Sequence, residues 1–166
     1  MSEYSFPLSK LSVGLRQASL SPPTIAIRVI NTHSAPVTIL TWESPLDPLA
    51  LQLGLLSITP AGADTPLDLP TIKVSRKVPP ESDSLITLEP GQGAERDVVL
   101  TEPLVPLDKL ASDGGAKARV QCKGRWVSVW PSRLNDISEE ALEKLGFGEK
   151  AMTGSFETEA LEIETK

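Results

Sequence analysis

The sequence predicts an all-β protein, an antiparallel β-sandwich of about seven to nine strands. Short segments in which apolar and polar residues alternate recur along the chain, which is the pattern of strands buried on one face. The 15 prolines are spread over the 166 residues, where they interrupt helices and favour turns and strand edges. Only one segment carries the start and stop signals of a helix.

Each alternating segment ends at turn residues, as expected for strands that are joined by short hairpins. The first segment ends near Pro22, and the second ends at the turn formed by residues 31–36. The expected strand segments are residues 11–15, 24–30, 37–42, 51–58, 71–75, 84–88, 95–101, 116–122, 126–130 and 155–164. Residues 116–122 and 126–130 form either two strands or one long strand that bends at Gly124.

The single helix is expected near residues 138–145. Ser138 is a suitable N-cap, Leu142 and Leu145 form an apolar edge, and Gly146 is a suitable C-terminal stop. The cysteine pair of antibody domains is absent, since the chain has one cysteine. The expected fold is therefore an immunoglobulin-like antiparallel β-sandwich with one short helix.

The length of the chain fits one domain, residues 1–166, whose first nine residues are expected to be a flexible N-terminal extension. A looser linker at residues 102–115 contains one helical turn at residues 107–110. Neither side of this linker is long enough to hold a full sandwich, so a single domain is predicted.

The charge of the chain argues against a nucleic-acid partner. The net charge is −6, and phosphate backbones are bound mainly by clustered Lys and Arg. The densest basic stretch, residues 117–125, holds four basic residues and fits a solvated face of a sheet. The apolar run at residues 46–58 is too short and too interrupted to span a membrane.

The cysteine count and the N-terminus predict a cytoplasmic protein. Cys122 is the single cysteine, so an intrachain disulfide of the kind that stabilises small secreted domains is impossible. Residues 1–10 have neither the basic region nor the apolar region of a secretory signal.

The residues that catalysis requires are missing from the sequence. His33 is the single histidine and lies in a turn, whereas metal sites and general-base catalysis need clustered partners. Cys122 alternates with Val120 and Ala118, which predicts a buried and inert thiol. The sequence therefore predicts no catalytic residue, no metal site, no cofactor and no enzymatic activity.

The tryptophans are the most informative aromatic residues. Trp126 and Trp130 are expected on the same face of one strand, together with Ser128, and sandwiches bury such rings between their sheets. If Trp130, which precedes Pro131, lies at the open end of the sandwich, it would instead anchor a partner.

Three stretches carry a resemblance to a known family. Residues 29–32 end a strand in Asn-Thr, residues 39–47 follow as a hydrophobic strand and a polar turn, and residues 82–91 end in Leu-Glu-Pro-Gly. In this order the chain resembles the N-terminal propeptide domain of fungal deuterolysin-type zinc metalloproteases, over roughly residues 10–165. The chain departs from that family because it has neither the signal peptide nor the protease domain. The resemblance implies a module that binds another protein, such as an intracellular protease inhibitor.

Three hypotheses of function follow. The first is a non-enzymatic module that binds another protein, such as a protease, through an exposed loop at residues 60–70 or 76–83. Its expected contact residues are Arg76, Lys77, Pro79, Pro80, Asp83 and Trp130. The second is a small-molecule-binding protein or an unusual enzyme with a pocket between the sheets near Trp126, Trp130 and Cys122. The third is a structural domain that self-assembles through edge strands, and the sequence leaves the oligomeric state open.

Overall fold

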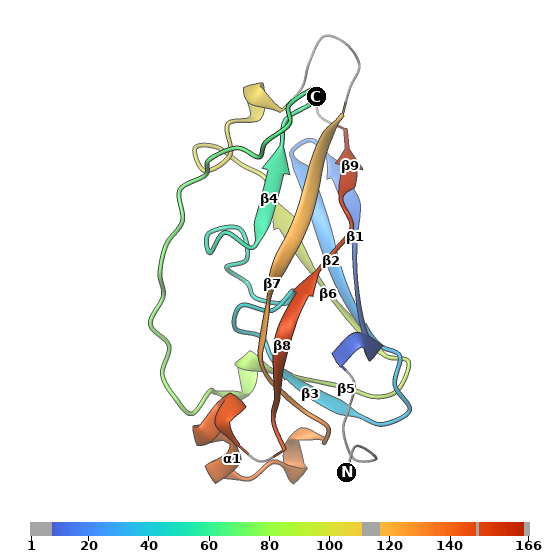
Figure 1. Cartoon of the computed structure of the whole chain (residues 1–166), viewed down its shortest axis with the longest axis vertical. Helices are drawn as coiled ribbons and strands as arrows, with labels where there is room; N and C mark the ends of the chain where they lie inside the picture. Colours follow the sequence, from blue (N-terminus) through green and yellow to red (C-terminus); the bar gives the residue numbers. More distant parts are fainter. Residues whose placement is uncertain (1–7, 111–116, 149, 165–166) are drawn as a thin grey trace.

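The structure is a computed structural model that describes residues 8–110, 117–148 and 150–164 (Figure 1). Residues 1–7 of the expected N-terminal extension lie outside the described part, and Leu8–Lys10 forms a short 3₁₀ helix. Part of the expected linker also lies outside it, whereas Leu107–Lys109 forms the helical turn that was predicted there.

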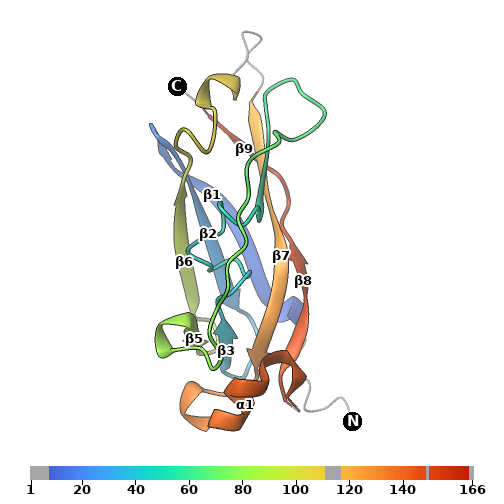
Figure 2. The ribbon, with the colours of Figure 1, turned by 90° about the vertical axis from the view of Figure 1, so that its left-hand side faces the viewer.

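The predicted all-β class is confirmed, because the described residues form antiparallel sheets and one short α-helix. The strands are β1 (Leu11–Leu20), β2 (Pro23–Asn31), β3 (Val37–Leu40), β4 (Leu56–Thr59), β5 (Leu85–Leu88), β6 (Gly93–Val99), β7 (Ala118–Trp130), β8 (Met152–Glu157) and β9 (Leu161–Ile163). Strands β1, β2 and β6 form one sheet, and the other six strands form the second. Figure 2 shows the two sheets facing each other.

Strand β2 is the centre of the three-stranded sheet and has β1 and β6 as its neighbours. Its residues Ile25, Ile27 and Val29 alternate along the strand and are buried on the inner face. On the outer face Arg16 of β1 reaches Glu95 of β6 across the central strand, with 2.9 Å between Nη2 and Oε1. The sheet therefore has the apolar inside and polar outside that the alternation predicts.

Strand β7 organises the second sheet. Its first half pairs with β4 and β9, and its second half pairs with β3 and β8. Strand β5 completes the sheet beside β3. Of the two arrangements expected for residues 116–130, the single long strand through Gly124 is the one found.

The core fills the space between the two sheets. Ile27 and Val98 from the first sheet pack in one cluster with Ile58, Val120 and Cys122 from the second. In a neighbouring cluster the ring of Trp126 packs against Phe156, with 5.4 Å between the ring centroids. These contacts across the sheets make the fold a β-sandwich.

The two sides of the sandwich are closed differently. On one side the side chain of Gln17 in β1 donates to the carbonyl of Glu164 at 2.8 Å and accepts from its N–H at 2.8 Å. On the other side residues 41–55 make a series of turns between β3 and β4. Arg96 of β6 donates to the carbonyl of Leu46 at 2.9 Å, so this turn segment also bridges the two sheets.

Three of the expected strands differ from the structure. Residues 71–75 are not a strand, and residues 51–55 are turns that precede β4. The expected final strand at residues 155–164 is two strands, β8 and β9, which pair with different halves of β7. Alternation marks which residues face the body of a protein, but it does not show whether a neighbouring strand is present to pair with them.

The helix α1 (Glu139–Lys144) agrees with the prediction. The hydroxyl of Ser138 accepts a hydrogen bond from the N–H of Ala141 at 3.0 Å, which is the expected N-cap. The residue after the helix with positive φ is Leu145, at 50°, and not the expected Gly146. Gly146 instead lies so close to the backbone of Val127 that a Cβ would be 2.7 Å from the carbonyl oxygen.

The close contacts of Gly124 in β7 predict that this residue cannot carry a side chain. A Cβ there would lie 2.6 Å from the carbonyl oxygen of Glu43 and 2.9 Å from the ring of Phe156. We expect Gly124→Ala to lower the free energy of unfolding by about 1–3 kcal/mol, the usual cost of overpacking. Urea denaturation measures the change, and Gly14→Ala, with nothing within 4 Å of its Cβ, is the matched control. Equal stability of the two variants would contradict the argument.

A second prediction concerns the pair that connects the end of β5 to the segment before α1. Arg133 donates two hydrogen bonds to the carboxylate of Glu89, at 2.7 and 2.8 Å, and these bonds lower the pKa of Glu89 from its ordinary value. A pKa that is lower in the folded state stabilises the fold above the ordinary value, and this stabilisation is lost as pH falls through the folded value. We expect Arg133→Gln to raise the pKa of Glu89, as measured by NMR titration of its side chain. An unchanged titration would show that the pair does not form in solution.

Candidate functional site

The turn that follows β3 places a carboxylate in the interior of the protein. The hydroxyl of Ser44 donates to the carbonyl of Thr41 at 2.7 Å and accepts from the N–H of Leu46 at 3.0 Å. These bonds and the backbone turns around them bring Asp47 inward, where its side chain is fully buried. An ionised carboxylate is stable in such a position only when its oxygens are well supplied with donors.

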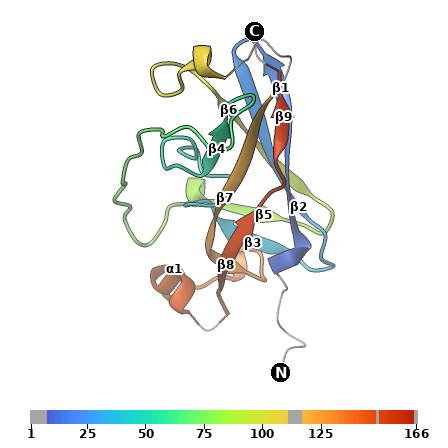
Figure 3. The same ribbon diagram turned by 45° about the horizontal axis from the view of Figure 1, so that its top comes forward.

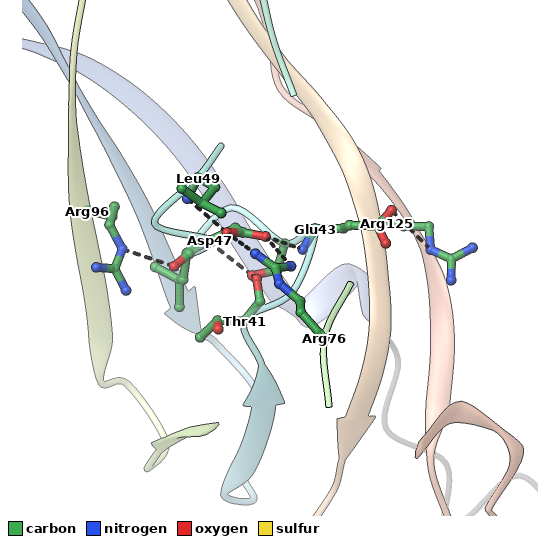
Figure 4. A network of polar contacts seen from close by, with 9 residues as sticks. Thr41, Glu43, Asp47, Leu49, Arg76, Arg96 and Arg125 are labelled. Atoms are coloured by element: carbon green, nitrogen blue, oxygen red, sulfur yellow. Dashed lines mark hydrogen bonds and ion pairs between the residues drawn. The ribbon is translucent and has the colours of Figure 1, made fainter. Parts of the chain in front are cut away.

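Asp47 accepts four hydrogen bonds (Figure 4). The backbone N–H of Glu43 donates to Oδ2 at 2.7 Å, and that of Leu49 donates to Oδ1 at 2.9 Å. The guanidinium of Arg76 donates to both oxygens, from Nη1 at 2.9 Å and from Nη2 at 3.0 Å. This bidentate geometry is the strongest pairing that arginine makes with a carboxylate.

Arg76 is held by a second contact besides the carboxylate. Its Cζ lies 5.8 Å from the centroid of the Trp42 ring, within the range of a cation–π interaction. The side chain is 17% exposed, so most of the guanidinium is removed from water. Arg96 and Arg125 contact the same turn from the two sheets, through Leu46 and Glu43 respectively (Figure 4). The turn is therefore fixed to both sheets and to Arg76.

Residues 71–80, which we call the strap, carry Arg76 along the outside of the molecule. The strap runs from the turn that precedes β4 towards the 3₁₀ turn Ser82–Ser84 that precedes β5, and it is part of the long green segment in Figures 1 and 3. The N–H of Ile72 bonds to the carbonyl of Gln52 at 3.0 Å. Among the described residues, none hydrogen-bonds to the backbone groups of residues 73–80.

The strap is thus attached to the body at three points that are four residues apart. These points are the backbone of Ile72, the side chain of Arg76 and the buried Pro80. Between them the chain is exposed, including the apolar side chains of Val74 at 39% and Val78 at 48%. An extended segment with exposed apolar side chains and unpaired backbone groups is suited to bind another chain.

Two hollows flank the attachment of Arg76, and both are lined by Arg76 and Trp42. The first has a volume of about 540 Å³ and is also lined by Lys77, Pro79 and Asp83. The second has a volume of about 500 Å³ and is lined by Ile72 and Val74 of the strap and by Val127 of the second sheet. The strap therefore stands over hollowed surface on both sides of its central anchor.

The structure brings most of the expected contact residues together. Arg76, Lys77, Pro79 and Asp83 line one hollow, and Pro80 follows them as a buried residue. Arg76, which was expected to contact a partner, has its guanidinium bound to Asp47 instead. Lys77, Pro79 and Asp83 are exposed.

Trp130 lies apart from this group and is 2% exposed. It packs with Leu40 and Leu85, and the segment that contains α1 covers it. Trp130 is therefore not the exposed ring at the open end of the sandwich that would anchor a partner. Trp126 and Val129 pack in a different cluster, because the pairing of β7 with β8 shifts register between them. This irregularity separates the two tryptophans that were expected on one face.

Two residues of the site, Asp47 and Trp42, were not recognised from the sequence. The signal for Asp47 is its position inside the apolar run at residues 46–58, where an acidic residue calls for a buried partner. The partner lies 29 residues further along the chain, so sequence spacing could not identify it. The signal for Trp42 is weaker, since a tryptophan at the end of a strand is common in a core.

Cys122 and His33, the single cysteine and the single histidine of the chain, lie outside this site. Cys122 is buried in the core cluster, and desolvation raises the pKa of its thiol to about 12, as expected for an inert cysteine. The ring Nδ1 of His33 accepts a hydrogen bond from the N–H of Ala35 at 3.1 Å within the turn. No group of three or more His, Cys, Asp or Glu in the described part of the chain is placed to hold a metal ion.

Comparison with known proteins agrees with the two-sheet architecture. A family model of an immunoglobulin-like domain matches residues 10–165. The chain belongs to this immunoglobulin-like family. The immunoglobulin-like domain is also similar to an uncharacterized secreted protein of Arthroderma benhamiae. The two are 27% identical over an alignment of 166 positions that covers 95% of this chain and 80% of the relative.

The secreted relative contradicts the cytoplasmic location that was predicted from the sequence. That prediction rested on the pattern of residues 1–10 and on the absence of a disulfide, but an immunoglobulin-like core of this size does not need a disulfide for its stability. A buried thiol with a raised pKa also resists oxidation outside the cell. Among the described residues, no helix has the length and apolar character needed to cross a membrane.

The buried pair in the immunoglobulin-like domain predicts a large loss of stability when its carboxylate is removed. Asp47→Ala leaves two backbone N–H groups and most of a guanidinium unpaired, so we expect it to lower the free energy of unfolding by about 3–5 kcal/mol. Glu95→Ala removes the partner of Arg16 from a pair at the surface, for which about 0–1 kcal/mol is expected.

Urea denaturation measures both losses of stability, and hydrogen exchange shows whether the turn at residues 41–49 opens. Faster exchange at the N–H groups of Glu43 and Leu49 is expected in Asp47→Ala alone. Similar losses in the two variants would mean that the buried pair does not hold the strap.

Proposed function

We propose that the protein is a secreted, non-enzymatic module that binds another protein, and that the strap is its contact segment. The observation that carries the proposal is the state of the strap: residues 73–75 and 77–79 are exposed between its anchors, and residues 73–79 have unpaired backbone groups. A partner can place one of its strands, or a cleft, against such a segment. The main-chain hydrogen bonds that form then supply affinity, and pockets of the partner that receive alternate side chains supply specificity.

The anchoring of the strap supports binding, because a segment that is already ordered loses less conformational entropy in a complex. Arg76 and Pro80 restrict the strap in the free protein, so a partner meets it in one arrangement. The secreted relative supports a partner outside the cell. The resemblance to deuterolysin-type propeptides supports a protease as that partner, held in an inhibited state.

The two other hypotheses have less support in the structure. The interior near Trp126 and Cys122 is packed by core residues. Neither residue lines the two hollows beside the strap or the hollow beside α1. Trp130 lines a hollow of about 400 Å³, but that hollow lies outside the sheets, beside α1. Self-assembly is tested by sedimentation at several concentrations, in which a constant monomer mass would exclude it.

Binding through the strap is tested by capture from the culture fluid of the organism that produces the protein. The tagged protein is compared with a double variant of the strap, Lys77→Glu with Val78→Asp. The matched control is Lys109→Glu with Val99→Asp, which makes the same chemical changes at an exposed lysine and at a valine that is 43% exposed.

We expect the wild type and the control to retain one and the same protein, identified by mass spectrometry, and the strap variant to lose it. The captured protein should also protect the N–H groups of residues 73–78 from hydrogen exchange. If the strap variant retains the partner, or if the protected residues lie elsewhere, the strap is not the contact segment.

A further inference from the structure

We infer that Lys77 is the specificity residue of the strap, and that its partner is a serine protease which cleaves after lysine or arginine. This inference rests on the proposed function and names the partner class of the same site. The specificity pocket of such proteases carries a carboxylate at its base, which receives a basic side chain from the residue before the cleaved bond.

The exposure of the side chains selects Lys77. Arg76 points into the body to reach Asp47. The next residue, Lys77, is exposed and lines the hollow beside Trp42. The basic group nearest to it in sequence is already bound internally, which leaves Lys77 as the group offered to an acidic pocket.

The charge of the strap agrees with such a partner. The protein as a whole carries a net charge of −6, whereas residues 71–80 contain no acidic residue. Of their three basic residues Arg76 is paired with Asp47, and Lys73 and Lys77 are exposed. A basic segment on an acidic protein directs an acidic pocket towards the strap and away from the rest of the surface.

The anchors on both sides of the Lys77–Val78 bond distinguish an inhibitor from a substrate. On the N-terminal side Arg76 is joined to the buried Asp47 by two hydrogen bonds. On the C-terminal side Pro80 is buried two residues after Val78. If this bond is cut, the new ends remain attached to the body through Arg76, one residue before the cut, and through Pro80, two residues after Val78.

The chemistry of the protease then becomes reversible. The serine oxygen attacks the carbonyl carbon of Lys77 and gives its proton to the histidine, which passes it to the nitrogen of Val78 as the peptide bond breaks. A normal substrate releases this amine, and water then hydrolyses the ester. Here the anchored amine of Val78 stays beside the ester and attacks it again, which restores the peptide bond and the serine. The protease is retained on the strap instead of turning over.

The strap contains its own control residue. Lys73 also follows an anchor and is exposed, but that anchor is the single backbone hydrogen bond of Ile72 rather than a buried ion pair. Lys73 therefore lacks the rigid attachment that holds Lys77 in place. Substitution at Lys73 tests whether any lysine of the strap is sufficient.

The experiment measures inhibition constants of the full chain against trypsin and chymotrypsin. We expect the wild type to inhibit trypsin, and Lys77→Ala to weaken this inhibition by about 30-fold or more, as for a hot-spot residue. Lys77→Leu should transfer inhibition to chymotrypsin, whose pocket is apolar. Lys73→Ala should leave the inhibition constant unchanged, and circular dichroism checks that all variants are folded. After long incubation, mass spectrometry should find a fraction that is cut only at the Lys77–Val78 bond.

Three results would overturn the inference: no inhibition of trypsin, cleavage after Lys77 without inhibition, or an equal effect of Lys73→Ala and Lys77→Ala. Each of them leaves the broader function to be decided by the capture experiment. A partner that is lost in the strap variant but is not a protease would refute the protease assignment while supporting the binding module. A partner that the strap variant retains would refute the binding module itself.

Discussion

The pairing of Arg76 with the buried carboxylate of Asp47 is the constraint on which the rest of the site depends. Four N–H donors satisfy the carboxylate, and two of them come from the turn that Asp47 itself organises. The same turn receives Arg96 from one sheet and Arg125 from the other (Figure 4). The position of the strap is therefore defined relative to both sheets through one carboxylate. A buried ion pair does not by itself stabilise a fold, but it specifies which segments meet.

This constraint explains how the strap remains extended without joining a sheet. A strand is normally held by a ladder of backbone hydrogen bonds, but the strap is held at intervals by side chains and by one backbone bond. Pro79 and Pro80 carry no backbone N–H, so the end of the strap cannot complete a ladder. Exposed edges of this kind invite pairing with other chains, and proteins usually cover them. Leaving this segment uncovered is physically consistent with a contact surface.

The sequence predicted those parts of the fold that depend on local patterns. β2, β3 and the N-cap of α1 were recognised because alternation and capping act over a few residues. Residues 71–75 were taken for a strand because their alternation is real, although no neighbouring strand pairs with them. The role of Asp47 was missed, since it depends on the strap, which is distant in sequence. The burial of Trp130 was the favoured expectation, but its cover by the segment that contains α1 was not foreseen. Long-range partners of this kind leave no mark in local spacing.

The positions of the anchors also explain which of the expected contact residues are exposed. Lys77, Pro79 and Asp83 are exposed because they lie between or after the anchors, and their exposure follows from the positions of Arg76 and Pro80. Fixing the backbone of one residue costs about 1–2 kcal/mol of conformational free energy, and a free loop would lose this amount for each residue ordered by a partner. The anchored strap loses part of that freedom when the protein folds, where burial of the core compensates the loss. The buried carboxylate therefore orders a short basic segment without secondary structure before any partner arrives, as the proposed function requires.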